Sequence, residues 1–403
     1  MSVSLHIAFV TPWYGADIPG GAEAELRGLA EHFAAFHEGV EVEVLTTCVK
    51  EFTSDWSKNY HKPGSEQVRG VKVTRFPVRK RSTRDFDQVN LKFIKHMAVS
   101  KAEEDVFFRE MIRSPDLENY ITTHAQDIDL FVYIPYMFGT TYWGVKACPE
   151  RAVLIPCLHD EGYAAMSLVK EMFSQVKGVA CLAKPEMELA HKLYPRSQAQ
   201  MAVLGAGVDT HHEGFPEEFR QKFGLEGPMV LYAGRKDSGK NVDGLLRGYA
   251  LYKHRYPKDR SKLVLIGGGT IDIPPAIKDQ VVDLGFVSID DKYNAYAAAS
   301  VLCQPSMNES FSIVIMESWL AGTPVIVNGK CAVTKDFCQQ SNAGLYYDSD
   351  IEFSEALGWL LSHDDARNKL GAQGSAFVLD HFSWSVVLTR YIEFFRNISA
   401  REE

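Results

Sequence analysis

Residues 308–326 read NESFSIVIMESWLAGTPVI, and this stretch decides the fold more than any other part of the chain. It runs from a polar loop into the apolar segment IVIM, and Gly322 followed by Pro324 ends the helix that this segment predicts. The run TPVIV that comes next is short and β-branched, as expected for a buried parallel strand. A loop, a helix and a strand in this order indicate one unit of an alternating α/β fold.

Two carboxylates flank the apolar segment. Glu309 lies in the loop, and Glu317 lies about one and a half turns inside a helix that begins near Ser312. The backbone amides of residues 310–312 would then be free at the helix N-terminus, where anions bind. Charged carboxylates accept hydrogen bonds well from sugar hydroxyls, so the combination favours a nucleotide-sugar site. The alternative is structural, because acidic residues are common near helix starts, where the helix dipole favours them.

The alternation of strands and helices extends over the whole chain, with strands predicted in the first half at 5–11, 40–47, 71–78, 129–135, 152–159, 178–183 and 198–205, and in the second half at 228–235, 261–269, 280–287, 300–306, 323–327 and 343–347. A polar, Gly-containing segment at 205–219 separates the halves and predicts a linker. We therefore expect two doubly wound α/β domains facing a cleft, residues 1–207 and 208–381. The amphipathic residues 382–403 predict a closing helix that packs across the domain seam.

Length and composition support this organisation and exclude several classes. The chain has 403 residues, enough for two domains of about 200 residues, and it is 46% apolar and 24% charged, as in soluble globular proteins. We expect neither a transmembrane helix nor a signal peptide. Seven scattered cysteines without a C-x-x-C pair indicate buried thiols in a cytoplasmic protein. The net charge of −9 argues against nucleic-acid binding, and no metal-binding spacing occurs.

Further polar residues follow predicted strands at their carboxyl ends, where open α/β sheets bind ligands. Gly20 and Gly21 allow a tight turn before a helix, which would leave N–H groups facing the cleft, although such a turn is most often only a loop. Arg235 and Lys240 follow the first strand of the second domain and suit a diphosphate group. The alternative for these two cations is a solvated turn.

His159 opens the triplet HDE after an apolar strand of the first domain. A core histidine would lie inside the apolar run, so its place at the end favours a position in the cleft. Consecutive residues diverge in direction and therefore ligate one metal ion poorly. We expect no metal here, and the roles of Asp160 and Glu161 stay open.

One basic stretch, VRKRSTR at residues 78–84, contains Arg79, Lys80, Arg81 and Arg84. Such a cluster can contact an anionic membrane surface or a lipid-diphosphate acceptor, at about 1 kcal/mol per basic residue. More often it is a solvated loop. Peripheral contact with the inner face of the membrane is thus a hypothesis from this stretch.

Taken in this order, the motifs resemble those of the family 4 retaining glycosyltransferases, which have the GT-B fold of two Rossmann-like domains. The resemblance covers nearly the whole chain. It rests on PGGAE (19–23), CLHDE (157–161), GVD (207–209), AGR with KN (233–241), ESFSIVIME (309–317), AGTPVI (321–326) and FSW (382–384).

The resemblance implies a reaction that needs no metal and no cofactor. A hexosyl group would move from a nucleotide-diphosphate sugar to an acceptor with retention of the anomeric configuration. Arg235 and Lys240 would hold the donor diphosphate, and Glu317 would bind the ribose hydroxyls. The leaving phosphate oxygen would serve as the base, which explains why the sequence shows no obvious general base.

The resemblance also implies roles around the donor sugar. Glu309, with Ser310 and the amides from Phe311 to Ile313, would hold this sugar. His159 would contact it and orient the reaction, and the turn at Gly20 and Gly21 would close over the phosphates.

The chain departs from the commonest family pattern, because Ser310 and Ser312 stand where glycines flank Phe311. We expect serine to adopt the helix-start geometry and to cap the helix with its hydroxyl. Similar variants occur among polysaccharide and O-antigen assembly enzymes, so we expect a role in bacterial or archaeal surface-glycan assembly. The donor would be a UDP- or GDP-sugar, between which the sequence does not distinguish, and the acceptor a lipid-linked or polysaccharide glycan. A nucleotide-sugar 2-epimerase on the same fold and a non-catalytic, transferase-like partner subunit are the alternatives.

Overall fold

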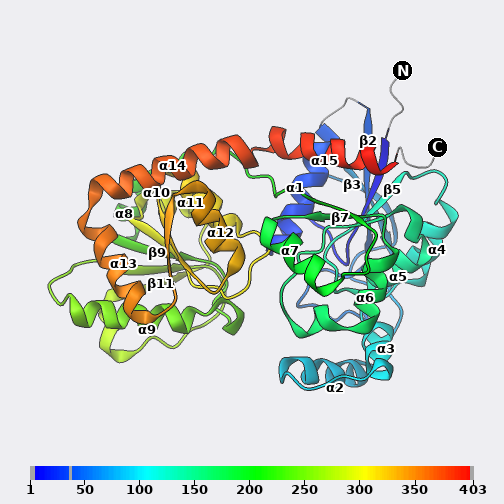
Figure 1. The fold of residues 1–403 in the computed structure, drawn as a ribbon, viewed down its shortest axis with the longest axis horizontal. Coiled ribbons are helices and arrows are strands. Elements are labelled where there is room, and N and C mark those ends of the chain that lie inside the picture. Colours follow the sequence, from blue (N-terminus) through cyan, green and yellow to red (C-terminus); the bar gives the residue numbers. More distant parts are fainter. Residues whose placement is uncertain (1–4, 36–38, 400–403) are drawn as a thin grey trace. The chain divides into compact units, whose positions relative to one another are not determined.

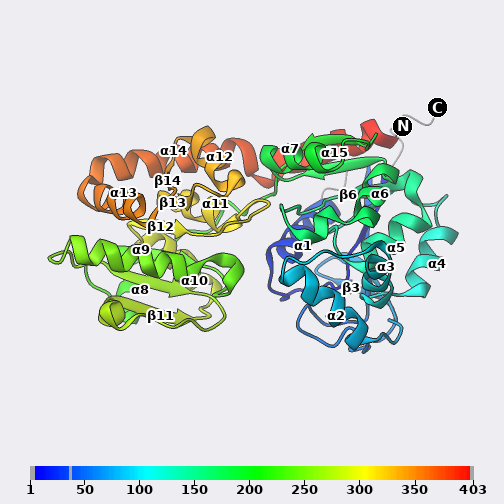
Figure 2. The same cartoon turned by 60° about the horizontal axis from the view of Figure 1, so that its bottom comes forward.

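The computed structural model describes residues 5–35 and 39–399, which form two compact units (Figure 1). Unit 1 contains the described residues up to Gly207 and those from Val387 onward, and unit 2 contains Val208–Val386. Each unit has one predominantly or wholly parallel sheet with helices on both faces (Figure 2). The predicted fold class of two doubly wound α/β domains is confirmed.

The sheet of unit 1 has the strand order β3-β4-β2-β1-β5-β6-β7-β8. Its strands are β1 (Leu5–Val10), β2 (Val40–Thr47), β3 (Gly64–Val68), β4 (Val71–Phe76), β5 (Leu130–Tyr133), β6 (Ala152–Leu154), β7 (Gly178–Cys181) and β8 (Gln200–Val203). Strand β3 pairs antiparallel with β4 at the edge of the sheet, and the other neighbours are parallel. The sequence did not predict β3, because its residues GSEQV are polar and almost fully exposed and show no apolar alternation.

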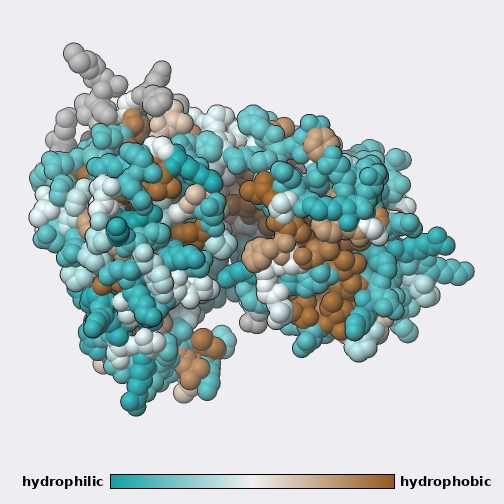
Figure 3. Space-filling view, turned by 180° about the vertical axis from the view of Figure 1, so that it is seen from behind, coloured by the Kyte–Doolittle hydropathy of each residue, from teal (hydrophilic) through white to brown (hydrophobic). Residues whose placement is uncertain are grey.

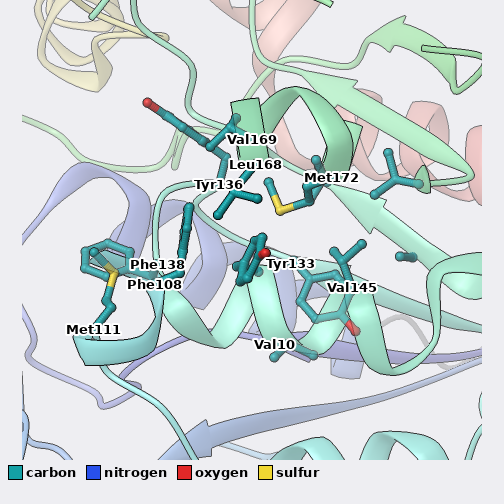
Figure 4. Close-up of a cluster of buried hydrophobic side chains, with 14 of the residues drawn as sticks. Val10, Phe108, Met111, Tyr133, Tyr136, Phe138, Val145, Leu168, Val169 and Met172 are labelled. Atoms are coloured by element: carbon teal, nitrogen blue, oxygen red, sulfur yellow. The ribbon is translucent and has the colours of Figure 1, made fainter. Parts of the chain in front are cut away.

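The helices of unit 1 are α1 (Gly21–Ala35), α2 (Thr83–Ile94), α3 (Lys101–Glu110), α4 (Pro115–Thr123), α5 (Gly139–Ala147), α6 (Ser167–Gln175) and α7 (Lys184–Leu193), with short 3₁₀ turns η1 (Pro149–Arg151) and η2 (Gly162–Ala165). Apolar side chains from β1, β5, α5 and α6 meet in its core, among them Val10, Tyr133, Val145 and Met172 (Figure 4). Helix α15 (Trp384–Ser399) also joins this unit, since Phe33 of α1 lies 6.5 Å from Tyr391 and 6.3 Å from Phe395, measured between ring centroids.

The sheet of unit 2 is parallel and has the order β11-β10-β9-β12-β13-β14. Its strands are β9 (Met229–Ala233), β10 (Lys262–Ile266), β11 (Val281–Gly285), β12 (Val301–Gln304), β13 (Val325–Asn328) and β14 (Gly344–Tyr347). Counted along this unit, the order is third, second, first, fourth, fifth, sixth, as in the Rossmann fold. The order reverses between β9 and β12, and such switch points are where open α/β sheets bind ligands.

The helices of unit 2 are α8 (Pro216–Phe223), α9 (Val242–Arg255), α10 (Ile289–Ala298), α11 (Ile313–Leu320), α12 (Ala332–Ser341), α13 (Asp350–Ser362) and α14 (Asp364–Phe382), with 3₁₀ turns η3 (Ser238–Lys240) and η4 (Pro275–Gln280). Helices α9 and α13 bury one apolar cluster against the sheet. Helix α11 packs closely on α14, because a Cβ on Gly371 would lie 1.8 Å from the Gly322 carbonyl oxygen. Helix α12 was not predicted, and α8 begins inside the predicted linker.

Two segments that the resemblance rests on, GVD and FSW, are hydrogen-bonded to each other in unit 2. The Val208 N–H donates to the Phe382 carbonyl over 2.8 Å, and Trp384 Nε1 donates to Asp209 Oδ1 over 2.8 Å. The start of the predicted linker is therefore fixed by pairing with the end of α14. Within residues 5–35 and 39–399, no helix is both long enough and apolar enough to cross a membrane.

Candidate functional site

The carboxyl ends of β9 and β12 bring two loops together at the switch point of unit 2. One loop runs from 234 to 241 and the other from 305 to 312. Asn241 Nδ2 donates to the Pro305 carbonyl over 3.1 Å, and Lys240 Nζ lies 2.7 Å from Glu309 Oε1. The fold thus pairs two predicted site residues that lie far apart in the sequence, at the edge of the sheet where ligands bind.

The pair of Lys240 and Glu309 is partly shielded from water, with 26% and 11% of their side chains exposed. Each supplies the opposite charge that a half-buried ion needs. An anionic ligand that reached Lys240 would compete with Glu309 for its ammonium group. Glu309 would then have oxygens free to accept hydrogen bonds from hydroxyl groups.

Arg235 does not take part in this contact. Its side chain is 68% exposed, and its Nε lies 3.4 Å from Asp237 Oδ2. The neighbouring Lys236, which the sequence did not single out, is fully buried; its ammonium donates to the Gly267 carbonyl and lies 3.0 Å from Asp283 Oδ1. Lys236 therefore ties the ends of β9, β10 and β11 together, whereas Arg235 remains accessible to a ligand.

Gly267 shows why glycine is needed beside this site. Its φ is +116°, and a Cβ there would lie 2.1 Å from the Gly234 carbonyl oxygen. The loop after β10 can approach the loop after β9 this closely only because residue 267 has no side chain.

Ser312 adopts a left-handed backbone with φ +82° and ψ +72° just before α11. The expectation that its hydroxyl caps the helix is wrong, because this N-cap residue makes no side-chain capping bond. Instead, Gln304 Nε2 donates to Ser312 Oγ over 3.1 Å, which ties the helix start to the last residue of β12. A left-handed backbone points the hydroxyl away from the N–H groups of the first turn, and glycine adopts this conformation more easily.

We expect Ser312→Gly to be nearly neutral for stability and Ser312→Val to be strongly destabilising. Glycine removes about 1 kcal/mol of left-handed strain but also loses a hydrogen bond of similar strength. Valine keeps the strain, adds a β-branched side chain at positive φ and is expected to cost more than about 2 kcal/mol. Urea unfolding of the three proteins measures this. A Ser312→Val protein as stable as the wild type would contradict the left-handed conformation.

Phe311 anchors the loop that carries Glu309. Its side chain is 3% exposed and packs edge-on against Phe337 and Phe382, at centroid distances of 5.3 and 5.1 Å. Ser310, which precedes it, and Ile313, the first residue of α11, are partly exposed. The ring therefore fixes the backbone amides of residues 311–313 at the start of α11, where the first N–H groups lack partners within the helix.

Glu317 is buried, and its carboxylate is held by three side chains of α10. Oε1 accepts from Lys292 Nζ over 2.6 Å and from the Tyr293 hydroxyl over 3.2 Å, and Oε2 accepts from the Tyr296 hydroxyl over 2.8 Å. Burial first, and the charge of Glu317 next, raise the pKa of both phenols above the usual value, so both remain protonated donors. Sequence reasoning missed these three partners, because no pattern within α10 shows which residues face a later helix.

In unit 1, Gly20 and Gly21 form the expected turn before α1, after the carboxyl end of β1. Gly20 has φ +138°, and a Cβ there would lie 2.0 Å from Glu23 Oε2. Trp13 Nε1 donates to Glu23 Oε1 over 2.8 Å, which holds the turn against the loop that follows β1. The turn thus lies at an edge where parallel sheets bind ligands.

His159 lies in the loop after β6, partly exposed, and the predicted strand 152–159 is shorter than expected because it ends at Leu154. The buried Glu186 fixes this loop, since its Oε1 accepts from the Leu158 N–H over 2.6 Å. Burial raises the pKa of Glu186 to about 7. Glu161 Oε1 accepts from the Tyr136 hydroxyl over 2.9 Å, so it has a structural contact.

The predicted site residues therefore fall into two sets, one with Gly20, Gly21 and His159 in unit 1, and one with Lys240, Glu309 and the remaining residues in unit 2. Among the residues that the structure describes, no three His, Cys, Asp or Glu side chains are grouped as metal ligands. That the reaction needs no metal remains a prediction.

Residues 215–377 match the model of the family described as glycosyl transferases group 1. This part of the chain is similar to the glycosyl transferases of group 1. The matched range contains Arg235, Lys240, Glu309 and Glu317.

Two relatives show how far the similarity extends. The D-inositol 3-phosphate glycosyltransferase of Corynebacterium urealyticum is 25% identical over 231 residues, which cover 52% of this chain and 54% of the relative. The chain thus matches about half the length of this kind of relative. An uncharacterized glycosyltransferase of Methanocaldococcus jannaschii is 22% identical over 413 residues, with 97% and 98% of the two chains covered.

Solved structures of similar fold cover the chain almost completely. Sucrose-phosphate synthase from Thermosynechococcus elongatus has a TM-score of 0.72 at 17% identity, with 99% of this chain and 100% of that one covered. Anabaena HepE in complex with UDP-glucose has a TM-score of 0.66 at 16% identity, with 98% and 100% covered. At these identities the likeness concerns the fold, which is GT-B.

Proposed function

We propose that the protein is a retaining glycosyltransferase that moves a hexosyl group from a UDP- or GDP-sugar to a lipid-linked or polysaccharide acceptor in surface-glycan assembly. The observation that carries this proposal is the pair of Lys240 and Glu309 at the switch point of unit 2. The match to the group 1 glycosyltransferase model and the structural likeness to a protein solved with UDP-glucose support a nucleotide-sugar donor.

In the proposed reaction, Lys240 and Arg235 neutralise the donor diphosphate as the bond between the sugar C1 and the phosphate oxygen breaks. The negative charge on the leaving group grows during this step, so fixed cations stabilise the transition state more than the ground state. The backbone N–H groups at the start of α11 add to the positive electrostatic potential of these two cations. Once the phosphate replaces Glu309 on Lys240, the carboxylate accepts hydrogen bonds from the donor sugar.

The acceptor hydroxyl is proposed to attack C1 from the face that the phosphate leaves. A new bond forms between C1 and the acceptor oxygen, and the hydroxyl proton passes to the departing phosphate oxygen. The configuration at C1 is then retained, and the chain needs to supply no separate base. In this scheme His159 contacts the donor sugar, and the turn at Gly20 and Gly21 closes over the phosphates.

A transfer assay tests the proposal. The purified chain is incubated with UDP-glucose or GDP-mannose and a membrane glycolipid extract, and release of the nucleoside diphosphate is followed with and without EDTA. We expect release that requires the acceptor, survives EDTA and gives a product with the anomeric configuration of the donor. Strict dependence on Mg²⁺ or Mn²⁺ would refute the metal-free reaction. Release without acceptor together with a C2-epimerised sugar would identify an epimerase instead.

Peripheral membrane contact is the second part of the proposal, and we choose its residues by their exposure and their contacts within unit 1. Arg79 Nη2 lies 3.5 Å from Glu110 Oε2, and the guanidinium of Arg81 lies 4.9 Å from the ring centroids of Trp56 and Phe86. These two arginines have contacts within unit 1, whereas Lys80 and Arg84 are exposed.

The end of α2 is better suited to contact a membrane than Arg79 and Arg81 are. Leu91, Ile94 and Met97 are 47, 62 and 54% exposed, and Lys95 lies exposed among them. In Figure 3, apolar residues gather at the bottom of unit 1, over the segment that Figure 1 labels α2. Residues 79–101 contain seven Lys and Arg and only two Asp, although the whole chain is acidic. Apolar side chains within a basic segment suit the headgroup region of an anionic bilayer, so we infer that a cytoplasmic chain binds there through α2.

Sedimentation with lipid vesicles tests this contact. We expect the wild type to bind vesicles that contain phosphatidylglycerol and not vesicles of phosphatidylcholine alone. The variant Leu91→Gln/Ile94→Gln is expected to lose at least about tenfold in partitioning, because burying each apolar side chain contributes about 1.5 kcal/mol or more. Ile351→Gln, which alters a 59% exposed side chain on α13, is the control. Equal binding by all three proteins would refute the role of α2.

A further inference from the structure

The carboxylate of Glu317 contacts two buried tyrosine hydroxyls and one partly exposed ammonium group. Tyr293 and Tyr296, which are 8% and 0% exposed, close it off from within unit 2. Lys292 is the most exposed of the three partners, with 30% of its side chain exposed against 7% for Glu317. A ligand that approaches Glu317 from solvent therefore meets the ammonium group of Lys292 first.

The number of free acceptor positions on Glu317 is also limited. A carboxylate can accept about four hydrogen bonds, and Lys292, Tyr293 and Tyr296 already supply three. Two neighbouring ribose hydroxyls cannot both donate to the position that remains. Glu317 alone therefore does not suit a ribose diol as well as its place in the sequence motif implies.

Lys292 has the hydrogen-bonding capacity that Glu317 lacks. Its ammonium group carries three N–H donors, and one of them is used on Glu317. A hydroxyl oxygen accepts hydrogen bonds as well as donating them, so the same diol can donate once to Glu317 and accept once from Lys292. The ammonium also lies 4.6 Å from the ring centroid of Tyr293, which holds it in place.

The position of Lys292 in the fold agrees with this role. Helix α10 starts at Ile289, shortly after β11 ends at Gly285, so its first turn lies at the carboxyl edge of the sheet. The loops that carry Lys240 and Glu309 lie at the same edge. A nucleotide whose diphosphate reaches Lys240 would have its nucleoside at this edge.

We propose that Lys292 binds the nucleotide directly, by donating a hydrogen bond to a ribose hydroxyl oxygen of the bound nucleoside diphosphate while Glu317 accepts one from the neighbouring hydroxyl. This inference rests on the proposed function, because it requires a ribonucleotide in unit 2. It makes Lys292 a residue by which the site prefers ribonucleotides to their deoxy forms.

Calorimetric titration with UDP and GDP, and with their 2′-deoxy and 3′-deoxy analogues, tests the inference. A hydrogen bond to a charged group corresponds to about tenfold or more in affinity, so we expect the wild type to prefer the ribose form by at least this factor at one position. In Lys292→Met this preference is expected to fall to within about twofold of unity. An unchanged preference in the variant would overturn the proposal.

Lys222→Met is the matched control. Lys222 Nζ lies 2.7 Å from Asp291, the residue that precedes Lys292 on α10, so this variant also removes a cation that is paired with a carboxylate and contacts α10. Lys222 pairs with Asp291, whereas Lys292 pairs with Glu317, so we expect this variant to keep the ribose preference of the wild type. Loss of the preference in both variants would indicate a general disturbance of α10 and would overturn the specific role of Lys292.

Lys292→Met also removes the counter-charge of a buried carboxylate and could disturb the site for that reason. A second measurement therefore alters the nucleotide and leaves the protein unchanged. Fluorine replaces the 2′- and the 3′-hydroxyl group of the nucleotide, one at a time. Fluorine accepts hydrogen bonds weakly and cannot donate, so an ammonium attracts it and a carboxylate repels it. Tighter binding of the fluoro than of the deoxy form at one of the two positions supports Lys292, and weaker binding at both positions overturns its role. If neither UDP nor GDP binds the wild type, the proposed function fails as well, whereas binding without ribose preference overturns only this inference.

Discussion

Glu309→Ala is expected to lower turnover by at least about a hundredfold while changing stability little. In the proposed reaction Glu309 acts only once a donor has replaced it on Lys240, so its largest contribution comes with the substrate bound. Removing one preorganised polar partner of a reacting group typically costs about 10²- to 10³-fold in kcat. Because Lys240 is 26% exposed, water can solvate it in the variant, which limits the loss of folding free energy. Nucleoside diphosphate release and a thermal melt, run on the same preparation, measure both effects.

The pair of Lys253 and Asp259 provides a control with similar burial. Lys253 Nζ lies 3.1 Å from Asp259 Oδ1, with 11% and 16% of the side chains exposed. Asp259 precedes β10 and so lies at the opposite edge of the same sheet. Asp259→Ala is expected to show the reverse behaviour, with a lower melting temperature and an unchanged kcat. Full turnover by Glu309→Ala would remove Glu309 from the site.

Glu317→Ala is expected to destabilise unit 2 by roughly 3 kcal/mol or more. The variant leaves the hydroxyls of Tyr293 and Tyr296 without their acceptor in a buried position, and each such group costs about 1–3 kcal/mol. Lys292 loses its counter-ion in addition, although it is partly exposed and can turn to water. Urea unfolding followed by circular dichroism measures this loss.

Glu317→Gln is the matched control, because glutamine keeps the shape and one acceptor oxygen for the tyrosine hydroxyls. We expect this variant to lose clearly less stability than Glu317→Ala. If Glu317→Ala unfolds within about 1 kcal/mol of the wild type, the carboxylate is not the centre of the contacts with α10 described above.

The fold followed from the sequence wherever buried parallel strands appear as short apolar runs. Strands β9 and β12 were predicted within a few residues, because MVLYA and VLCQ are fully buried. The hairpin strand β3 lacked this signal, since it lies at an exposed edge. Helix α12 (AVTKDFCQQS) carries Val and Thr in its first turn and no side-chain cap, so its sequence marks its start weakly.

The candidate site was only partly predictable, for a different physical reason. Polar residues in loops that follow predicted strands, such as Lys240 and Glu309, can be recognised in the sequence. That these two residues pair depends on β9 and β12 being neighbours in the sheet, and the strand order is not visible in the sequence. The partners of Glu317 lie on a helix that precedes it in the chain, so no local spacing reveals them. The left-handed backbone of Ser312 is likewise invisible, because serine does not require it.

Titration of the wild type and of Lys240→Met with UDP-, GDP-, ADP- and dTDP-sugars, followed by thermal melting, tests the central claim most directly. A donor well above its Kd stabilises the folded state by a few kcal/mol, which raises the melting temperature by several degrees. We predict such a shift for one nucleotide class with the wild type and at most a small shift with Lys240→Met. No shift of the wild type with any of these sugars would contradict a nucleotide-sugar site at the switch point of unit 2.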